Sequence, residues 1–191
     1  MNCISMQQTS MDLVPEGVEF LGEFTESELI GADALTVLLG VTVGQRNDSS
    51  GRWLGFNDNG VVKYVAMQPF RVGVSWDELA SQNLALGNTQ ASVRGQRYTV
   101  RVLDGGPAAG GEWDRLFGAI TRDLEIHRYH PIELGLGRFQ AGRVSWCCNA
   151  NASDLTPRFI GRGGMSMWGE VASHAHDRHV LFGWRPVLEC V

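Results

Sequence analysis

The chain has 191 residues, a formal net charge of −5 and 43% hydrophobic residues, which is enough apolar material for one well-filled core. Because no basic excess is available to neutralise phosphates, we expect no nucleic-acid partner. The longest apolar stretch, Leu29–Val43, is too short and too interrupted to span a bilayer, and the N-terminus lacks the basic and apolar regions of a secretory signal. We therefore expect no membrane insertion.

Glycine and charge content point to the same kind of protein. The 24 glycines are well above the average of about 7% of a chain and indicate many turns and irregular connections. Charged residues make up only 19%, so much of the surface must be neutral, as surfaces buried in an assembly often are. Lys63 is the only lysine, and the remaining basic side chains are arginines. Arginine forms forked hydrogen bonds that suit interfaces.

The first quarter of the chain shows little periodicity in its apolar residues. Met1–Phe24 is polar and irregular, and we predict an N-terminal arm or edge segment. We expect it to contact a neighbouring subunit, because terminal residues of this kind seldom order alone. Thr25–Glu28 has the Ser/Thr-x-x-Glu pattern of a helix start. Leu35–Val43 is apolar and β-branched, and it predicts a buried strand.

Two hairpins and two short helices follow. Trp53–Phe56 and Val61–Ala66 flank the turn Asn57–Gly60, and a second hairpin within Val93–Leu103 turns at Arg94–Gln96. In its return strand Tyr98, Val100 and Val102 share one face. A capping box at Ser75–Glu78 predicts a helix over Trp76–Gln82. The spacing of the apolar residues in Trp113–Ile120 predicts a second helix.

The last fifty residues alternate short strands with polar loops. Ser145–Cys148 is strand-like, and we expect Asn149–Pro157 and Met165–Arg178 to be exposed loops. Val180–Leu188 predicts a closing strand, in which a proline indicates an edge or a bulge. The domain plan is thus an arm over residues 1–24 and one domain over residues 25–191.

Two clusters of metal-binding or nucleophilic residues leave chemical alternatives. His174, His176 and His179 lie in one polar loop and could hold zinc, which gives a metal-dependent enzyme as the alternative function. The cysteines fit no paired CxxC spacing, and adjacent Cys147 and Cys148 would face opposite sides of a strand. We interpret them as free thiols and the histidine loop as solvated, and so expect no metal and no cofactor.

The order of motifs near the C-terminus resembles a known family. Ser145–Cys147, then Arg158–Gly164, Trp168 and Gly183–Glu189 resemble the ending of phage and prophage virion proteins. That ending is similar to the broader C-type-lectin-like group, which includes formylglycine-generating enzymes and the variable proteins of diversity-generating retroelements. The resemblance covers roughly residues 50–191.

The resemblance implies an α+β fold: a β-rich C-type-lectin-like domain with two short helices, irregular loops and the N-terminal arm. It implies a virion structural protein of the tail, baseplate or fibre apparatus, with capsid decoration as a second location, made in the host cytoplasm. The expected partners are other virion proteins and further copies of the chain, together with a host-surface glycan or receptor. Because the cysteines do not match the catalytic pair of the oxidases in this group, we predict no enzyme.

Four residues are predicted to make contacts. In C-type-lectin-like domains the loops before the closing strand usually form the contact surface. Here those loops contain Asn149, Asn151, Trp168 and His176, whose side chains can hydrogen-bond or stack on a glycan or a partner protein. Arg162 and Arg185 belong to the motif as well, and we expect them to staple irregular segments by pairing with carboxylates or carbonyls.

Overall fold

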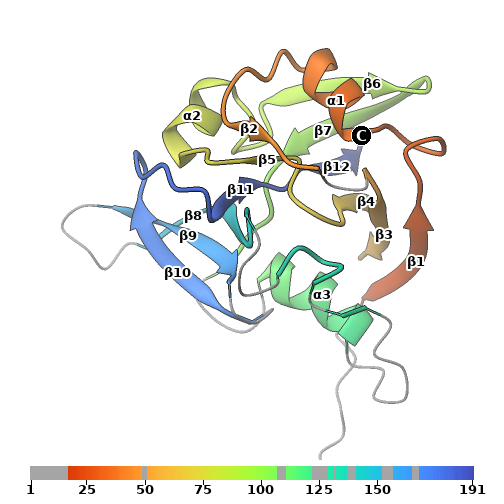
Figure 1. The fold of residues 1–191 in the computed structure, drawn as a ribbon. Helices are drawn as coiled ribbons and strands as arrows, with labels where there is room; N and C mark the ends of the chain where they lie inside the picture. The colour runs from red at the N-terminus through yellow and green to blue at the C-terminus, as the bar shows by residue number, and fades with distance from the viewer. Residues whose placement is uncertain are drawn as a thin grey trace, which may run out of the picture.

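The fold is α+β and rich in strands (Figure 1). The computed structural model describes residues 17–48, 51–106, 111–121, 129–130, 132–136, 141–151, 157–164 and 168–191. These residues form two six-stranded sheets and three short helices. None of the helices found there is long and apolar enough to cross a membrane.

The first sheet is antiparallel throughout and has the order β1–β3–β4–β12–β7–β6. Its strands are β1 (Val18–Phe24), β3 (Trp53–Asp58), β4 (Val61–Ala66), β6 (Thr89–Val93), β7 (Gln96–Arg101) and β12 (Val187–Cys190). The C-terminal strand β12 therefore lies in the middle of the sheet, between the two hairpins β3–β4 and β6–β7.

The second sheet has the order β10–β9–β8–β11–β5–β2, with β10 and β2 at its edges. Its strands are β2 (Gln45–Arg46), β5 (Arg71–Val72), β8 (Val144–Asn151), β9 (Arg158–Gly163), β10 (Glu170–His174) and β11 (Phe182–Trp184). The pair β8–β11 is parallel and the other neighbours are antiparallel.

Both predicted hairpins are confirmed. The turn Asn59–Gly60 joins β3 to β4, and Arg94–Gly95 joins β6 to β7. All four turn residues have positive φ angles, between 52° and 89°, as the tight type I′ turn requires. The predicted apolar face of β7 is also confirmed, because Tyr98 and Val100 are buried and Arg97 is exposed.

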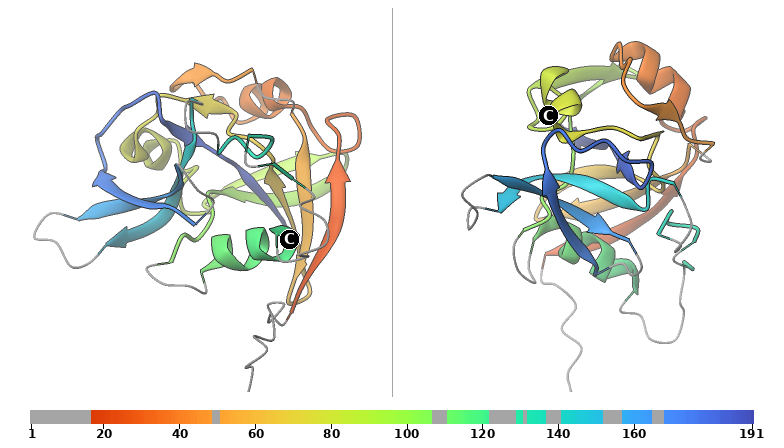
Figure 2. Two further views of the ribbon diagram at one scale, coloured as in Figure 1. Left: turned by 60° about the horizontal axis from the view of Figure 1, so that its bottom comes forward. Right: turned by 60° about the vertical axis from the view of Figure 1, so that its left-hand side comes forward.

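Two of the three helices agree with the sequence prediction. Helix α2 (Trp76–Ser81) begins at a capping box in which Ser75 Oγ accepts a hydrogen bond from the Glu78 N–H. Helix α3 (Glu112–Thr121) buries the predicted apolar stripe. Figures 1 and 2 show α1 and α2 at one end of the molecule and α3 at the opposite end.

The strand predicted at Leu35–Val43 is wrong. Residues Ala32–Leu38 form helix α1, which buries Leu35 and exposes 80% of Val37. A short apolar run has no clear period, so composition alone cannot separate a strand from a short helix. The helix ends at Leu38, and Gly40, which follows with a φ angle of 64°, donates its N–H to the carbonyl of Val37.

The predicted helix start at Thr25 is also wrong, although the capping contacts form. The Thr25 N–H donates to a Glu28 carboxylate oxygen at 2.8 Å, and the Glu28 N–H donates to the Thr25 carbonyl at 3.1 Å. These bonds close an isolated turn, and helix α1 begins seven residues later, at Ala32. A capping box satisfies local donors whether or not a helix continues from it.

The end of the predicted arm or edge segment, Val18–Phe24, is an edge strand of the first sheet. Residues Val18–Phe24 form strand β1, which pairs with β3 along its length, with a bulge between Phe20 and Gly22. The polar residues that made this segment look irregular alternate outward from an edge strand. Residues 1–16 lie outside the described residues. The predicted subunit contact of the arm falls on them and lies outside the described residues as well.

The predicted closing strand, Val180–Leu188, is two strands. Phe182–Trp184 belongs to the second sheet as β11, and Val187–Cys190 belongs to the first sheet as β12. The chain passes between the sheets at Arg185 and Pro186. Because proline has no N–H for a ladder, Pro186 suits the gap between two sheets and not the middle of one.

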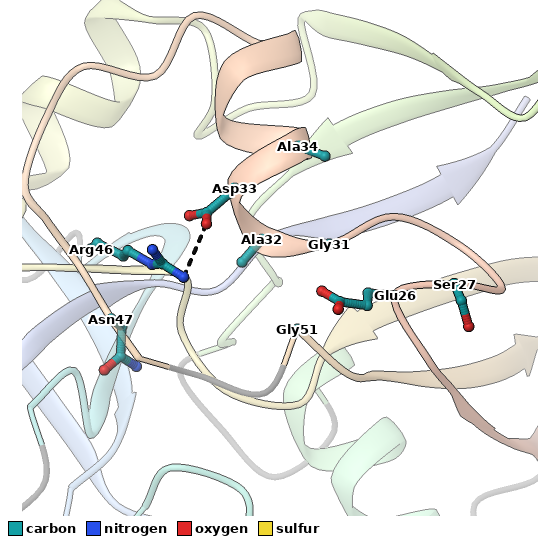
Figure 3. Close-up of a pocket in the computed structure, with 9 residues that line it drawn as sticks. All are labelled: Glu26, Ser27, Gly31, Ala32, Asp33, Ala34, Arg46, Asn47 and Gly51. Atoms are coloured by element: carbon teal, nitrogen blue, oxygen red, sulfur yellow. Dashed lines mark ion pairs between the residues drawn. The ribbon is translucent and has the colours of Figure 1, made fainter.

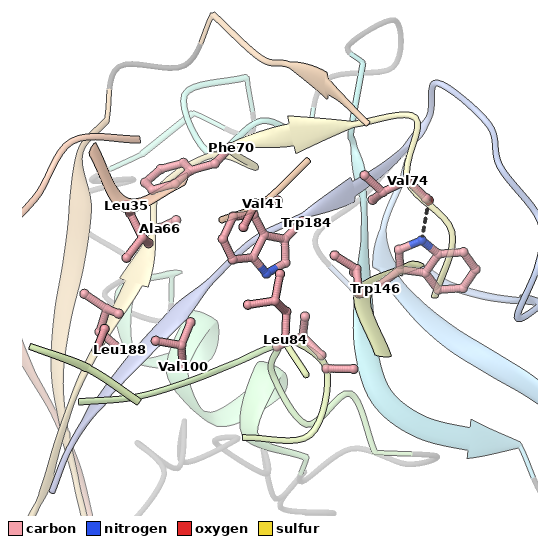
Figure 4. Close-up of a cluster of buried hydrophobic side chains, with 14 of the residues drawn as sticks. Leu35, Val41, Ala66, Phe70, Val74, Leu84, Val100, Trp146, Trp184 and Leu188 are labelled. Atoms are coloured by element: carbon pink, nitrogen blue, oxygen red, sulfur yellow. Dashed lines mark hydrogen bonds between the residues drawn. The ribbon is translucent and has the colours of Figure 1, made fainter. Parts of the chain in front are cut away.

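The larger of two apolar cores lies between the sheets and is built around tryptophans (Figure 4). Trp53, Trp146 and Trp184 are each at most 1% exposed. The Trp146 indole N–H donates to the Val74 carbonyl at 2.8 Å, and its ring stacks on Phe182 with centroids 4.2 Å apart. A second core lies between α3 and the first sheet.

The guanidinium of Arg185 connects both sheets and is 1% exposed. Its Nη atoms donate to the carbonyls of Ala66, Met67 and Leu134 at 2.5–3.0 Å, and its Nε donates to Ser145 Oγ at 3.0 Å. Its charge lies over two aromatic rings of α3, at 5.6 Å from each centroid. Burial lowers the pKa of Arg185 to about 9, so the group stays charged at neutral pH. The predicted staple role of Arg185 is confirmed.

A network of ion pairs fastens α3 to the first sheet. Lys63 Nζ on β4 lies 2.8 Å from Asp58 and 2.6 Å from Glu112 of α3. Arg101 on β7 lies 2.6 Å from Glu112 and 2.5 Å from Glu189 of β12. Burial raises the pKa of Glu112, but hydrogen bonds and charge from Arg101 and Lys63 outweigh it and lower that pKa to about 2.

Replacing Arg185 with methionine should destabilise the protein by about 3–5 kcal/mol, because three buried carbonyls lose their donors. Arg185→Lys should recover only part of the loss, since one ammonium cannot reach three separate segments. Urea unfolding of each variant gives the free energy. The exposed Arg46→Met is the control, with a change within about 0.5 kcal/mol. A similar, small change in all three variants would show that Arg185 is not a staple.

The free energy of unfolding should decrease as the pH falls from about 4.5 towards 2, because Glu112 becomes protonated. The folded-state pKa of Glu112 is about 2 and its ordinary value is 4.5, so its stabilisation is complete above pH 4.5 and is lost as the pH falls towards 2. The loss is on the order of 2–3 kcal/mol. The free energy of unfolding, measured from pH 6 to pH 2, should therefore fall less steeply in Glu112→Gln. Parallel curves for the two proteins would contradict this assignment.

Candidate functional site

The two predicted asparagines lie on β8, and one has an internal role. Asn149 Oδ1 accepts hydrogen bonds from the N–H groups of Gly105 and Gly106 at 2.7 and 3.3 Å. It therefore fixes the backbone at Gly105 and Gly106. The backbone of Asn151 pairs with Arg158 on β9, and its side chain lies outside the described residues. The segment predicted as a loop from Asn149 thus begins as strand.

Trp168 and His176 flank β10 and are exposed. Trp168 precedes the strand and is 48% exposed. His176 follows it, with 78% of its side chain exposed and its ring stacked on His174 at a centroid distance of 5.6 Å. No hydrogen bond or ring contact among the described side chains joins Asn149, Trp168 and His176. The predicted residues do not form one cluster, since Asn149 lies near the start of β9 and Trp168 near its end.

The loop predicted at Met165–Arg178 contains an edge strand, which corrects that prediction. Glu170–His174 forms β10 and pairs with β9. The turn after it is closed by Asp177, whose carboxylate accepts hydrogen bonds from the Ser173 hydroxyl and from the His174 N–H. The hydrogen bond from Ser173 lowers the pKa of Asp177.

The histidines predicted as an alternative metal site are not gathered around one point. His179 Nδ1 instead accepts a hydrogen bond from the Leu181 N–H at 3.1 Å. Among the described residues, no group of three histidine, cysteine or carboxylate side chains is placed to hold a metal ion.

A hollow of about 630 Å³ lies beside β10. We call it the β10 hollow. Its lining comes from the start of β8, the end of β9, strand β10 and the segment that leads into β11. The lining residues are Arg143, Val144, Gly163, Gly164, Gly169, Glu170, Val171, Ser173, His179, Leu181 and Phe182. Its volume is in the range of small-ligand sites.

Glycines on β9 and just after it shape this region. A Cβ atom on Gly161 would lie 2.4 Å from Val144 and 3.3 Å from Phe182, so only glycine fits beneath those side chains. Gly163 and Gly164 have φ angles of 104° and 94°, which other residues rarely adopt. These conformations end β9 and open the space beside β10.

The charged groups at the β10 hollow differ in how they are paired. Glu170 accepts a hydrogen bond from Arg162 Nη1 at 3.3 Å, and Arg162 also pairs with Asp114 of α3. The predicted staple role of Arg162 is therefore confirmed. Arg143 differs, because its Nε is buried with no hydrogen-bond partner, and its side chain makes no ion pair within the described part of the chain.

A second hollow, of about 410 Å³, lies over the start of α1 (Figure 3). Figure 3 shows the Glu26 carboxylate between Gly31 and Gly51. Across the hollow, Arg46 pairs with Asp33 at 3.0 Å, and both side chains are more than 60% exposed. Exposed pairs of this kind contribute little energy, so this hollow is a solvated polar surface.

The adjacent cysteines lie on β8 and are not arranged for nucleophilic chemistry. Cys147 is fully buried and Cys148 is half-buried, so the predicted alternation of the two side chains is confirmed. Burial raises the pKa of both thiols, which keeps them protonated at neutral pH. A protonated thiol is a weak nucleophile.

None of the four predicted contact residues lines the β10 hollow, although four residues of the predicted loop Met165–Arg178 do: Gly169, Glu170, Val171 and Ser173. Val171, Leu181 and Phe182 carry no chemical signature, and Arg143 precedes the recognised motif. The available signal was the run of glycines at Gly161, Gly163 and Gly164, because glycines on a strand mark a close approach or an open space. That signal locates the hollow without indicating what fills it.

Comparison of the chain with protein-family models, with curated proteins and with solved structures finds no match.

Trp168 should be the tryptophan most accessible to iodide, since four of the other five are at most 1% exposed and Trp76 is stacked on Phe159. Trp168→Phe should therefore remove most of the quenchable fluorescence. Trp76→Phe, at the half-buried position, should remove little of it. If Trp168→Phe leaves the quenching curve unchanged, Trp168 is covered and cannot contribute to an open surface.

Proposed function

We propose that this chain is a structural protein of a phage virion, in the tail, baseplate or fibre apparatus, and that it acts by binding through the face around the β10 hollow. One observation carries the proposal: exposed apolar side chains surround this hollow at the edge of a sheet. Trp168, Val171 and Val180 are 39–49% exposed and lie within or directly beside its lining segments. Apolar groups that surround a concave surface are typical of an interaction site.

The residues behind the family resemblance support this reading through their positions. Arg162–Gly164 borders the β10 hollow, and Gly183–Glu189 passes through the centre of the molecule. Both segments belong to what we call the frame, the two sheets and α3 with the buried arginines and ion pairs that join them. A C-type-lectin-like domain would need such a rigid frame in order to present variable loops. Arg162 and Arg185 make their contacts with backbone carbonyls and structural carboxylates. These motif residues therefore serve the frame, and the exposed residues beside them are free to bind.

Rigidity also favours assembly over catalysis as the basis of function. Lys63 and Arg101 each form an ion pair of 2.6 Å with Glu112, and these pairs belong to the internal network. With only 19% charged residues in the chain, much neutral surface remains for contact with other subunits. A partner can bury such a surface without paying the high desolvation cost of isolated charges.

Surface substitutions test the proposal in virions that carry the altered protein. Trp168→Ser and Val180→Ser should each lower host adsorption or particle assembly at least about tenfold, because each removes apolar contact area worth more than about 1.4 kcal/mol. Adsorption counts and particle yield separate the two roles.

Leu38→Ser and Val37→Ser are the matched controls, since these α1 side chains are 51% and 80% exposed and do not line the hollow. Full activity of the Trp168 and Val180 variants, with folded protein in the particle, would contradict the proposal.

A further inference from the structure

The β10 hollow holds a cation that nothing described in the protein neutralises. Arg143 lines the hollow, and its side chain forms no ion pair or hydrogen bond with the described residues. By contrast, Arg162 beside it contacts two carboxylates. A guanidinium that keeps its full charge at a concave surface attracts a carboxylate, which it can bind through two parallel hydrogen bonds.

The one carboxylate that lines the hollow does not remove this attraction. Glu170 lies 3.3 Å from Arg162 Nη1 and makes no ion pair with Arg143. Because Arg162 is shared with Asp114, the negative charge of Glu170 is reduced but not cancelled. His179 adds a donor, because its Nδ1 accepts the Leu181 N–H and its neutral ring must then carry the proton on Nε2. The hollow therefore offers a cation and an N–H donor to a ligand.

The remaining walls favour a ligand that also has an apolar face. Val171, Leu181 and Phe182 line the hollow, and the exposed ring of Trp168 directly precedes its lining residue Gly169. Sugar rings present C–H groups on one face and hydroxyls at their edges, which suits an aromatic ring beside polar groups. A sugar acid combines that face with a carboxylate.

We propose that the β10 hollow is a binding site for an acidic sugar, with Arg143 on the carboxylate, His179 on a ring substituent and Trp168 beside the sugar ring. The inference rests on the proposed function only in that this face of the protein binds a surface glycan. It adds the chemical class of the ligand and the residue that selects it.

Galacturonic acid and galactose form a matched pair for the test, because they differ in the carboxylate at one carbon. Titration of the intact protein with each sugar, followed by tryptophan fluorescence and by calorimetry, should give at least tenfold tighter binding of the acid. Arg143→Gln should abolish that preference. Arg46→Gln, which changes an exposed arginine on β2 at the opposite edge of the sheet, should keep it. The melting temperature verifies that each variant is folded, and the uncharged Arg143→Met replaces Arg143→Gln if the latter is not.

Three results would overturn the inference. The first is equal affinity for the acid and for galactose, and the second is an acid preference that survives in Arg143→Gln. The third is preferential binding of a short peptide through its free C-terminal carboxylate, which would assign the site to a protein ligand. In each case, reduced adsorption or assembly by Trp168→Ser would still support the proposed binding function, so the two failures can be distinguished.

Discussion

The buried guanidinium of Arg185 lies where the chain passes from the second sheet into the first, and it donates to three carbonyls from two segments, Ala66–Met67 and Leu134. No shorter or apolar side chain can supply those donors, and an unpaired buried carbonyl is costly. The charge itself is held without a carboxylate, by carbonyl dipoles, by Ser145 Oγ and by the faces of Trp113 and Phe117. The relative placement of the sheets and α3 depends on this one residue.

Around that point, the protein uses its few charges internally. Glu112 joins α3 to Lys63 and Arg101, and Arg162 joins the second sheet to α3 through Asp114. Internal pairs of this kind specify one arrangement of elements, because any other arrangement would leave a charge buried and alone. A frame held in this way can tolerate an edge strand and a hollow on one side. The proposed binding face beside β10 lies at an edge of the second sheet.

Much of the frame could be predicted from the sequence, because strong local signals and tertiary packing agree there. The hairpin turns at Asn59–Gly60 and Arg94–Gly95 and the capping box at Ser75 each contain their own stabilising chemistry. The errors fall where local signals are weak. Helix α1 is too short to show a period, and the edge strands β1 and β10 expose polar side chains that resemble a loop. The candidate site was located only as a region, since its walls are ordinary apolar residues brought together by β8, β9 and β11.

Hydrogen exchange tests the central claim, that the face around the β10 hollow is the contact surface, most directly. Amide exchange is compared between the isolated protein and the same protein in its assembled or ligand-bound form. The account predicts slower exchange in peptides that cover Gly169–Phe182, with β3 and β4 unchanged because they are already paired within the frame. Unchanged exchange across Gly169–Phe182, with new protection confined to α1 or β1, would place the contact surface on the other side of the molecule and contradict the account.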